Sequence, residues 1–152
     1  MRESTTQSIW ATIFWFIMIS FVLFYPMLIS IYVFLPLMIG FIGYILILGL
    51  DRSRAIYVVI SLIYLINLEV NLSLPLFLAI MTIILFYITI YPHLHVMKKC
   101  TVCIPLLSVI LIDFAYFIML FGYDIFLGES SIVIDQLLLY SLFVDILMVF
   151  LL

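Results

Sequence analysis

The chain has 152 residues, of which 70% are hydrophobic and only 9% are charged. Soluble globular chains carry roughly 25% charged residues, and a small soluble domain must cover most of its surface with polar groups. The 5 Lys and Arg residues and 8 Asp and Glu residues cannot do that. The composition therefore argues against a water-soluble domain and predicts an exterior that faces lipid.

The length limits the number of membrane crossings. A hydrocarbon core of about 30 Å takes about 20 helical residues, so six spans use about 120 residues and leave about 30 for loops and tails. Helices satisfy their backbone hydrogen bonds internally, as lipid requires. We therefore expect an all-α integral membrane protein with a single domain of six transmembrane helices. No room remains for a soluble catalytic domain.

The first third of the chain predicts a helical hairpin. No charged residue lies between Glu3 and Asp51, and this stretch is about 70 Å long as a helix, roughly two crossings. A break is expected at Tyr25 and Pro26, because proline lacks the N–H donor and disfavours helix at the preceding residue. Spans are predicted at about 7–25 and 29–50. Pro36 lies inside the second, where we expect a kink.

The remaining segments follow the same pattern. A charged cluster at residues 51–54 ends the hairpin, a turn is expected near Ser73 and Pro75, and loops are expected at 92–99 and 122–131. Four further spans are predicted at about 55–72, 75–91, 102–122 and 132–152.

Charge placement predicts the orientation, because cytoplasmic loops near spans are enriched in Lys and Arg. With six spans, all the basic residues fall on one side of the membrane: Arg2, Arg52, Arg54, Lys98 and Lys99. The opposite side receives only acids: Glu69, Asp124, Glu129 and Asp135. We therefore predict that both termini are cytoplasmic.

Two acids, Asp113 and Asp145, fall within predicted spans, where a central Asp costs about 2.5–3.5 kcal/mol on insertion scales. They are candidates for a proton or cation relay, since intramembrane acids often mark such paths. Because no Lys, Arg or His lies deep in any span, we favour a structural or partner-contact role, with protonated acids bonded to hydroxyl groups or carbonyls. Misplaced span boundaries are a third explanation.

Three polar residues gather at the end of the third span. Asn67 and Asn71 share one helix face, and Glu69 points roughly the opposite way. We favour a structural interpretation in which the amides bond across helices and Glu69 reaches the outer interface; a ligand or partner contact is the alternative. Gly40 and Gly43 suit a close helix contact in the second span.

His93, His95, Cys100 and Cys103 form the pattern H-x-H-x4-C-x2-C, which has the ligand types of a tetrahedral zinc site. Basic residues intervene, and Cys103 falls at the start of a span, so we favour reduced thiols and interfacial imidazoles over a metal site or a redox dithiol. No glycine-rich phosphate loop, nucleophile triad or basic nucleic-acid patch is visible. We predict no enzymatic activity, no cofactor and no nucleic-acid partner.

Several stretches resemble the rod shape-determining MreD family. Phe34 and Pro36 resemble that family's F-x-P region, residues 61–71 resemble its G-x-x-x-D-x-x-x-G stretch, and residues 106–113 resemble its fifth span, which often carries an acid. Asn67 stands where the family commonly has Asp, and Asn71 where it commonly has Gly.

The resemblance implies a six-helix bundle shared with the substrate-binding subunits of energy-coupling-factor vitamin transporters. It also implies a non-enzymatic subunit of the cell-elongation complex, which synthesises peptidoglycan and lies in the bacterial inner membrane. Such a subunit binds MreC and connects the MreB filament to RodA and its penicillin-binding transpeptidase. The basic loops are expected to contact anionic lipid or MreB, and the outer ends, at 69–74 and 124–131, partner proteins.

Two other functions stay open. A small membrane transporter, such as the vitamin-binding subunit, predicts an enclosed polar pocket near Asn67, Glu69 and Asp113, whereas a scaffold predicts a filled bundle with a large apolar partner surface. The third possibility is a membrane protein with a different partner.

Overall fold

The computed structural model describes residues 3–32, 35–94, 103–127 and 137–150. This part of the chain is all-helical, which confirms the predicted all-α class. The helices are α1 (Glu3–Ile31), α2 (Ile39–Asp51), α3 (Ala55–Asn71), α4 (Leu78–Thr89), α5 (Tyr91–Leu94), α6 (Cys103–Leu127) and α7 (Leu137–Phe150).

The predicted break at Tyr25 and Pro26 is wrong, because Pro26 lies inside the continuous helix α1. Proline removes one helical hydrogen bond and crowds the carbonyls of the preceding turn. In this turn the Leu23 carbonyl accepts a hydrogen bond of 2.8 Å from the side chain of Asn67 in α3. A neighbouring helix therefore satisfies the loosened backbone, so that α1 continues to Ile31.

The break falls later, at Pro36, which precedes α2 instead of kinking it. The residue before a proline is disfavoured in helix, and Met38 adopts a left-handed backbone with φ of 53°. Helix α2 has 13 residues, a length of about 20 Å. It is therefore shorter than the predicted 29–50 range, and its first turn lies within the bundle.

Helices α3, α4 and α7 lie within or close to the ranges predicted for them, and α5 adds a short turn after α4. The predicted loop beginning at Gly122 is wrong at its start, since α6 continues to Leu127. A Cβ placed on Gly122 meets nothing within 4 Å, and the flanking residues are large and apolar. One glycine costs a helix only about 1 kcal/mol relative to alanine, too little to end it.

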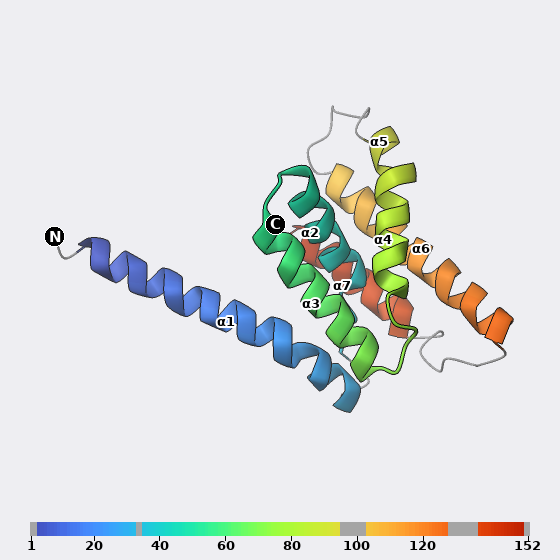
Figure 1. Cartoon of the computed structure of the whole chain (residues 1–152), viewed down its shortest axis with the longest axis horizontal. Helices are drawn as coiled ribbons and strands as arrows, with labels where there is room; N and C mark the ends of the chain where they lie inside the picture. Colours follow the sequence, from blue (N-terminus) through green and yellow to red (C-terminus); the bar gives the residue numbers. More distant parts are fainter. Residues whose placement is uncertain (1–2, 33–34, 95–102, 128–136, 151–152) are drawn as a thin grey trace.

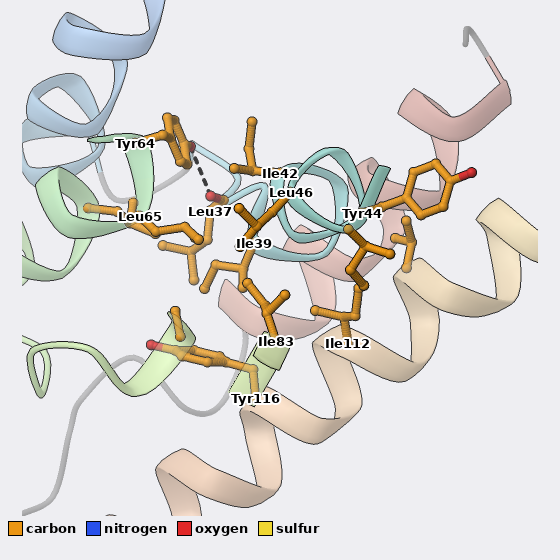
Figure 2. Packing of buried hydrophobic residues seen from close by; sticks show 14 of the residues in the cluster. Leu37, Ile39, Ile42, Tyr44, Leu46, Tyr64, Leu65, Ile83, Ile112 and Tyr116 are labelled. Carbon is orange, nitrogen blue, oxygen red and sulfur yellow. Dashed lines mark hydrogen bonds between the residues drawn. The ribbon is translucent and has the colours of Figure 1, made fainter. Parts of the chain in front are cut away.

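Helix α2 is the centre of the bundle, with contacts to α3, α4, α6 and α7. Helix α1 packs against α3 near its own C-terminal end, and its N-terminal part extends away from the other helices (Figure 1). The core between the central helices is apolar (Figure 2), and its fully buried members include Leu37, Ile39, Ile47, Tyr64, Leu65, Ile83 and Ile112.

Helices α2 and α3 end in the same way, with a serine in the left-handed region. Ser53 has φ of 52° and Ser73 has φ of 53°. After α3, the Leu74 N–H donates to the Glu69 carbonyl at 2.9 Å, and the Ser73 N–H to the Val70 carbonyl at 3.4 Å. This pair of bonds is the Schellman motif, which satisfies the last carbonyls of a helix and reverses the chain.

The exterior of the described helices is strongly apolar. Trp10, Phe16, Phe126 and Leu139 are each more than 70% exposed, whereas soluble monomers rarely expose such side chains in large patches. Among the described residues, one helical stretch, Cys103–Phe126, is long and apolar enough to cross a membrane by length and composition, and its most apolar window is only 33% buried. The core helix of a soluble protein would be mostly buried.

Candidate functional site: the polar cluster at the start of α2

The irregular segment before α2 enters the bundle, where its backbone groups need partners. Side chains from three helices supply them. The Tyr25 hydroxyl donates to the Pro36 carbonyl at 3.0 Å, the Tyr64 hydroxyl to the Leu37 carbonyl at 2.9 Å (Figure 2), and the Leu37 N–H donates to Ser141 Oγ at 3.1 Å. The segment is thus fixed by α1, α3 and α7.

Asp145 caps the first turn of α2 from another helix. The first N–H groups of a helix lack intrahelical partners, and Met38, the residue before α2, offers no side-chain cap. The Gly40 N–H instead donates to Asp145 Oδ2 at 2.9 Å. The positive end of the helix dipole favours a carboxylate there, so α7 is tied to α2 by a charge-assisted hydrogen bond.

Asp113 of α6 completes the cluster against the same glycine. A Cβ on Gly40 would lie 2.6 Å from Asp113 Oδ2, so any larger residue would force the Asp113 side chain to shift. The carboxyl groups of Asp113 and Asp145 lie close to each other, and Asp113 Oδ2 and Asp145 Oδ1 are buried without a hydrogen-bond partner among the described groups. Both side chains are buried, with exposed fractions of 6% and 0%. The structure therefore brings together two acids that the sequence placed in separate spans.

No cationic side chain in the described part of the chain approaches this acid pair. Arg52 and Arg54 are exposed at the opposite end of α2, where the Arg54 guanidinium lies 5.7 Å from the Tyr57 ring centre. His93 is exposed on α5 at the same end of the bundle (Figure 1). Lys98 and Lys99 lie outside the described residues.

The expectation that Glu69 reaches the outer interface is wrong, because its side chain is fully buried. Its two carboxylate oxygens accept hydrogen bonds of 2.7 Å from the Phe77 and Ala79 N–H groups at the start of α4. Phe77 has φ of 67°, an unfavourable conformation for an aromatic residue. Because the turn at Ser73 brings α4 back to α3, Glu69 serves as an N-terminal cap and is closed to partners.

Asn67 and Asn71 share a face, as predicted. Asn71 Nδ2 donates to Asn67 Oδ1 at 2.8 Å, and Asn67 Nδ2 donates to the Leu23 carbonyl of α1 at 2.8 Å. For Asn67 this confirms the expected bond across helices. Asn71 acts through Asn67 and makes no separate bond to another helix among the contacts described.

An apolar groove lies beside this contact, between α1 and α3. It has a volume of about 510 Å³ and opens widely to the exterior. Its lining is apolar apart from Asn67 and consists of Leu23, Phe24, Met27, Ile63, Ile66 and Val70.

The proposed zinc ligands are only partly described. His93 lies on α5, Cys103 begins α6, and His95 and Cys100 lie outside the described residues. Cys103 is disulfide-bonded, which contradicts the expected reduced thiol and removes this sulfur as a thiolate ligand. Within the described residues, no group of three or more His, Cys, Asp or Glu side chains is placed to hold a metal ion.

Sequence reasoning identified Asp113 and Asp145 but missed their contact with each other and with Gly40. Gly40 and Gly43 had signalled a close helix approach, and a Cβ on Gly43 would lie 3.1 Å from Ile112 of α6. Tyr64 and Ser141 gave no sequence signal. Comparison with protein-family models, curated proteins and solved structures found no match for this chain.

Proposed function

We propose that this chain is a non-enzymatic scaffold subunit of the MreD kind in the bacterial inner membrane. It binds MreC in the cell-elongation complex and links it to MreB, RodA and the penicillin-binding transpeptidase. One observation supports this most: three buried polar side chains bond to the chain's own backbone, Tyr64 at Leu37, Asp145 at Gly40 and Glu69 at Ala79. The polar interior therefore fixes the helices, and the apolar exterior remains for lipid and partners.

In this proposal α1, α2, α3, α4, α6 and α7 each cross the membrane. Helices α2, α4 and α7 are short, with 13, 12 and 14 residues; residues 35–38 extend the crossing of α2 by up to about 3.3 Å per residue. Arg52 and Arg54 face the cytoplasm under the positive-inside rule. The disulfide at Cys103 favours a position of this residue outside the cytoplasm, because disulfides are rare in the cytosol.

Cysteine accessibility decides the orientation. In a background lacking Cys100 and Cys103, we would introduce Arg54→Cys in the α2–α3 turn and Leu76→Cys in the α3–α4 turn, two exposed positions. A membrane-impermeant thiol reagent added outside sealed cells should label the variant at position 76 and not the one at position 54. The reverse pattern would contradict the orientation and, with it, contact between the basic turn and MreB.

The α1–α3 groove is the surface that we propose receives an apolar segment of MreC. A photo-cross-linking residue at Ile63, which lines the groove, should capture MreC in intact membranes. Ile118 of α6 is a matched control, since the two isoleucines are 43% and 54% exposed on different helices. Equal capture at both positions, or none at Ile63, would remove the groove from the interface.

A small membrane transporter is the second candidate, and one observation favours it. Helix α2 begins inside the bundle with its N-terminus at a buried acid pair, an arrangement that transporters use to bind substrates or ions. Asp113→Asn separates the two functions. For a scaffold, the correctly inserted variant should keep assembly and activity; complete loss of function in that variant would favour the relay.

A further inference from the structure

We propose that Asp113 and Asp145 together bind one proton, and that this proton-binding site holds α6 and α7 against the start of α2. The site lies inside the bundle and is distinct from the partner surface described above. Three features place it: the unpartnered buried oxygens of the two neighbouring carboxyl groups, the Gly40 N–H bound to Asp145, and the close approach of Asp113 to Gly40.

The hydrogen-bond inventory requires a proton. A carboxylate only accepts hydrogen bonds, so two ionised carboxylates cannot bond to each other. Asp113 Oδ2 and Asp145 Oδ1 are buried without a hydrogen-bond partner among the described groups. One proton between the two side chains converts these orphaned acceptors into a donor and an acceptor. Two neighbouring carboxyl groups in an apolar interior share a proton because both cannot ionise together.

The proton belongs on Asp113, with its O–H donating to Asp145. Asp145 faces the N-terminal end of a 13-residue helix and accepts the Gly40 N–H through Oδ2. The helix dipole and this bond both favour a negative charge on Asp145. Asp113 thus supplies the donor, and the pair carries one negative charge.

The other groups around the pair cannot replace the proton. Tyr25 of α1 and Tyr64 of α3 lie near Asp145, but their hydroxyls donate to Pro36 and Leu37. Among the remaining ionisable groups, Glu69 of α3 is held by the start of α4, Tyr116 of α6 lies near Glu69, and Tyr140 of α7 lies near Tyr25. A metal ion is a poor alternative, because structural sites use about four ligands and no described group of three His, Cys, Asp or Glu is suitably placed.

The site couples proton binding to helix packing. Removing the proton leaves two negative charges side by side across the α6–α7 contact, in surroundings that screen them weakly. Asp113 then repels Asp145, and the Gly40 N–H loses its fixed acceptor as α7 shifts. Proton release therefore loosens the start of α2.

Difference infrared spectroscopy on the purified full chain in lipid tests the site through the C=O stretch of a protonated carboxylic acid. We expect a buried acid band in the wild type at neutral pH. Asp113→Asn should abolish it, because the amide still donates to Asp145, which stays ionised. Asp51→Asn, the same change at an exposed acid, should leave it unchanged. Absence of the band in the wild type, or its persistence in Asp113→Asn, would overturn the proposal.

Two measurements on the wild type avoid the risk of misfolded variants. Dicyclohexylcarbodiimide, an apolar reagent for protonated carboxyl groups, should form an adduct at Asp113 that mass spectrometry locates; reaction only at other acids would refute the assignment. The infrared band should be the same in sodium chloride and in choline chloride. Loss of the band in sodium alone would replace the proton site with a sodium site and thereby overturn the proposal.

Discussion

Gly40→Ala tests the acid cluster most directly. A Cβ at position 40 would lie 2.6–2.7 Å from the three carboxylate atoms of Asp113, closer than real Cβ contacts. Asp113 packs between α2 and α6 with its side chain almost fully buried, so it has little space into which to move. Any shift also moves its carboxyl group relative to the neighbouring Asp145, which accepts the Gly40 N–H.

The magnitude follows from three opposing contributions. Alanine in a helix gains about 0.5–1 kcal/mol over glycine. Overpacking of a tight interior costs about 1–3 kcal/mol, and a buried polar group that loses its partner costs about 1–3 kcal/mol. The two costs together are about 2–6 kcal/mol and exceed the gain, so we expect Gly40→Ala to lower the free energy of unfolding by about 1–5 kcal/mol.

Unfolding in mixed micelles, followed by helical circular dichroism during titration with a denaturing detergent, measures this difference. Gly122→Ala is the matched control, since nothing lies within 4 Å of its added Cβ; it should gain about 0.5–1 kcal/mol. Adding Asp113→Ala to Gly40→Ala should remove the clash, so the double variant should be more stable than the sum of the single losses predicts. Equal stability of the two alanine variants would refute the close contact.

Three further substitutions test the polar contacts in the same unfolding assay. Glu69→Gln should lower the free energy of unfolding by about 2–3 kcal/mol, because an amide offers one acceptor oxygen to two N–H groups; a loss no larger than that of the exposed Asp51→Asn would contradict the cap. Tyr64→Phe should cost about 1–3 kcal/mol by leaving the buried Leu37 carbonyl unpaired, and no change would show that this carbonyl has another donor. Ser73→Gly should stabilise by about 0.5–1 kcal/mol, because glycine relieves the left-handed backbone there; a measured loss would argue against the Schellman turn.

The helix boundaries show where local signals sufficed. Unbroken apolar runs predicted helices, and the charged cluster at 51–54 correctly separated α2 from α3. Both proline predictions were wrong: Pro26 lies inside α1, and Pro36 lies in the irregular segment before α2 instead of kinking a helix. Both outcomes depend on neighbours, since Asn67 of α3 bonds the turn before Pro26 and the Tyr25 hydroxyl bonds the Pro36 carbonyl. A prediction from the residues next to each proline includes neither of these hydrogen-bond partners.

Composition and periodicity alone determined that this chain is helical, that its exterior is apolar, and that Asp113 and Asp145 are buried, because those properties follow from the residues of each segment. Only the tertiary structure decided that the two acids meet at Gly40, and that Glu69 turns inward to cap α4. The physical reason is that a carboxyl group in an apolar interior must find a hydrogen-bond partner. Which partner it finds depends on how helices from distant parts of the chain pack together.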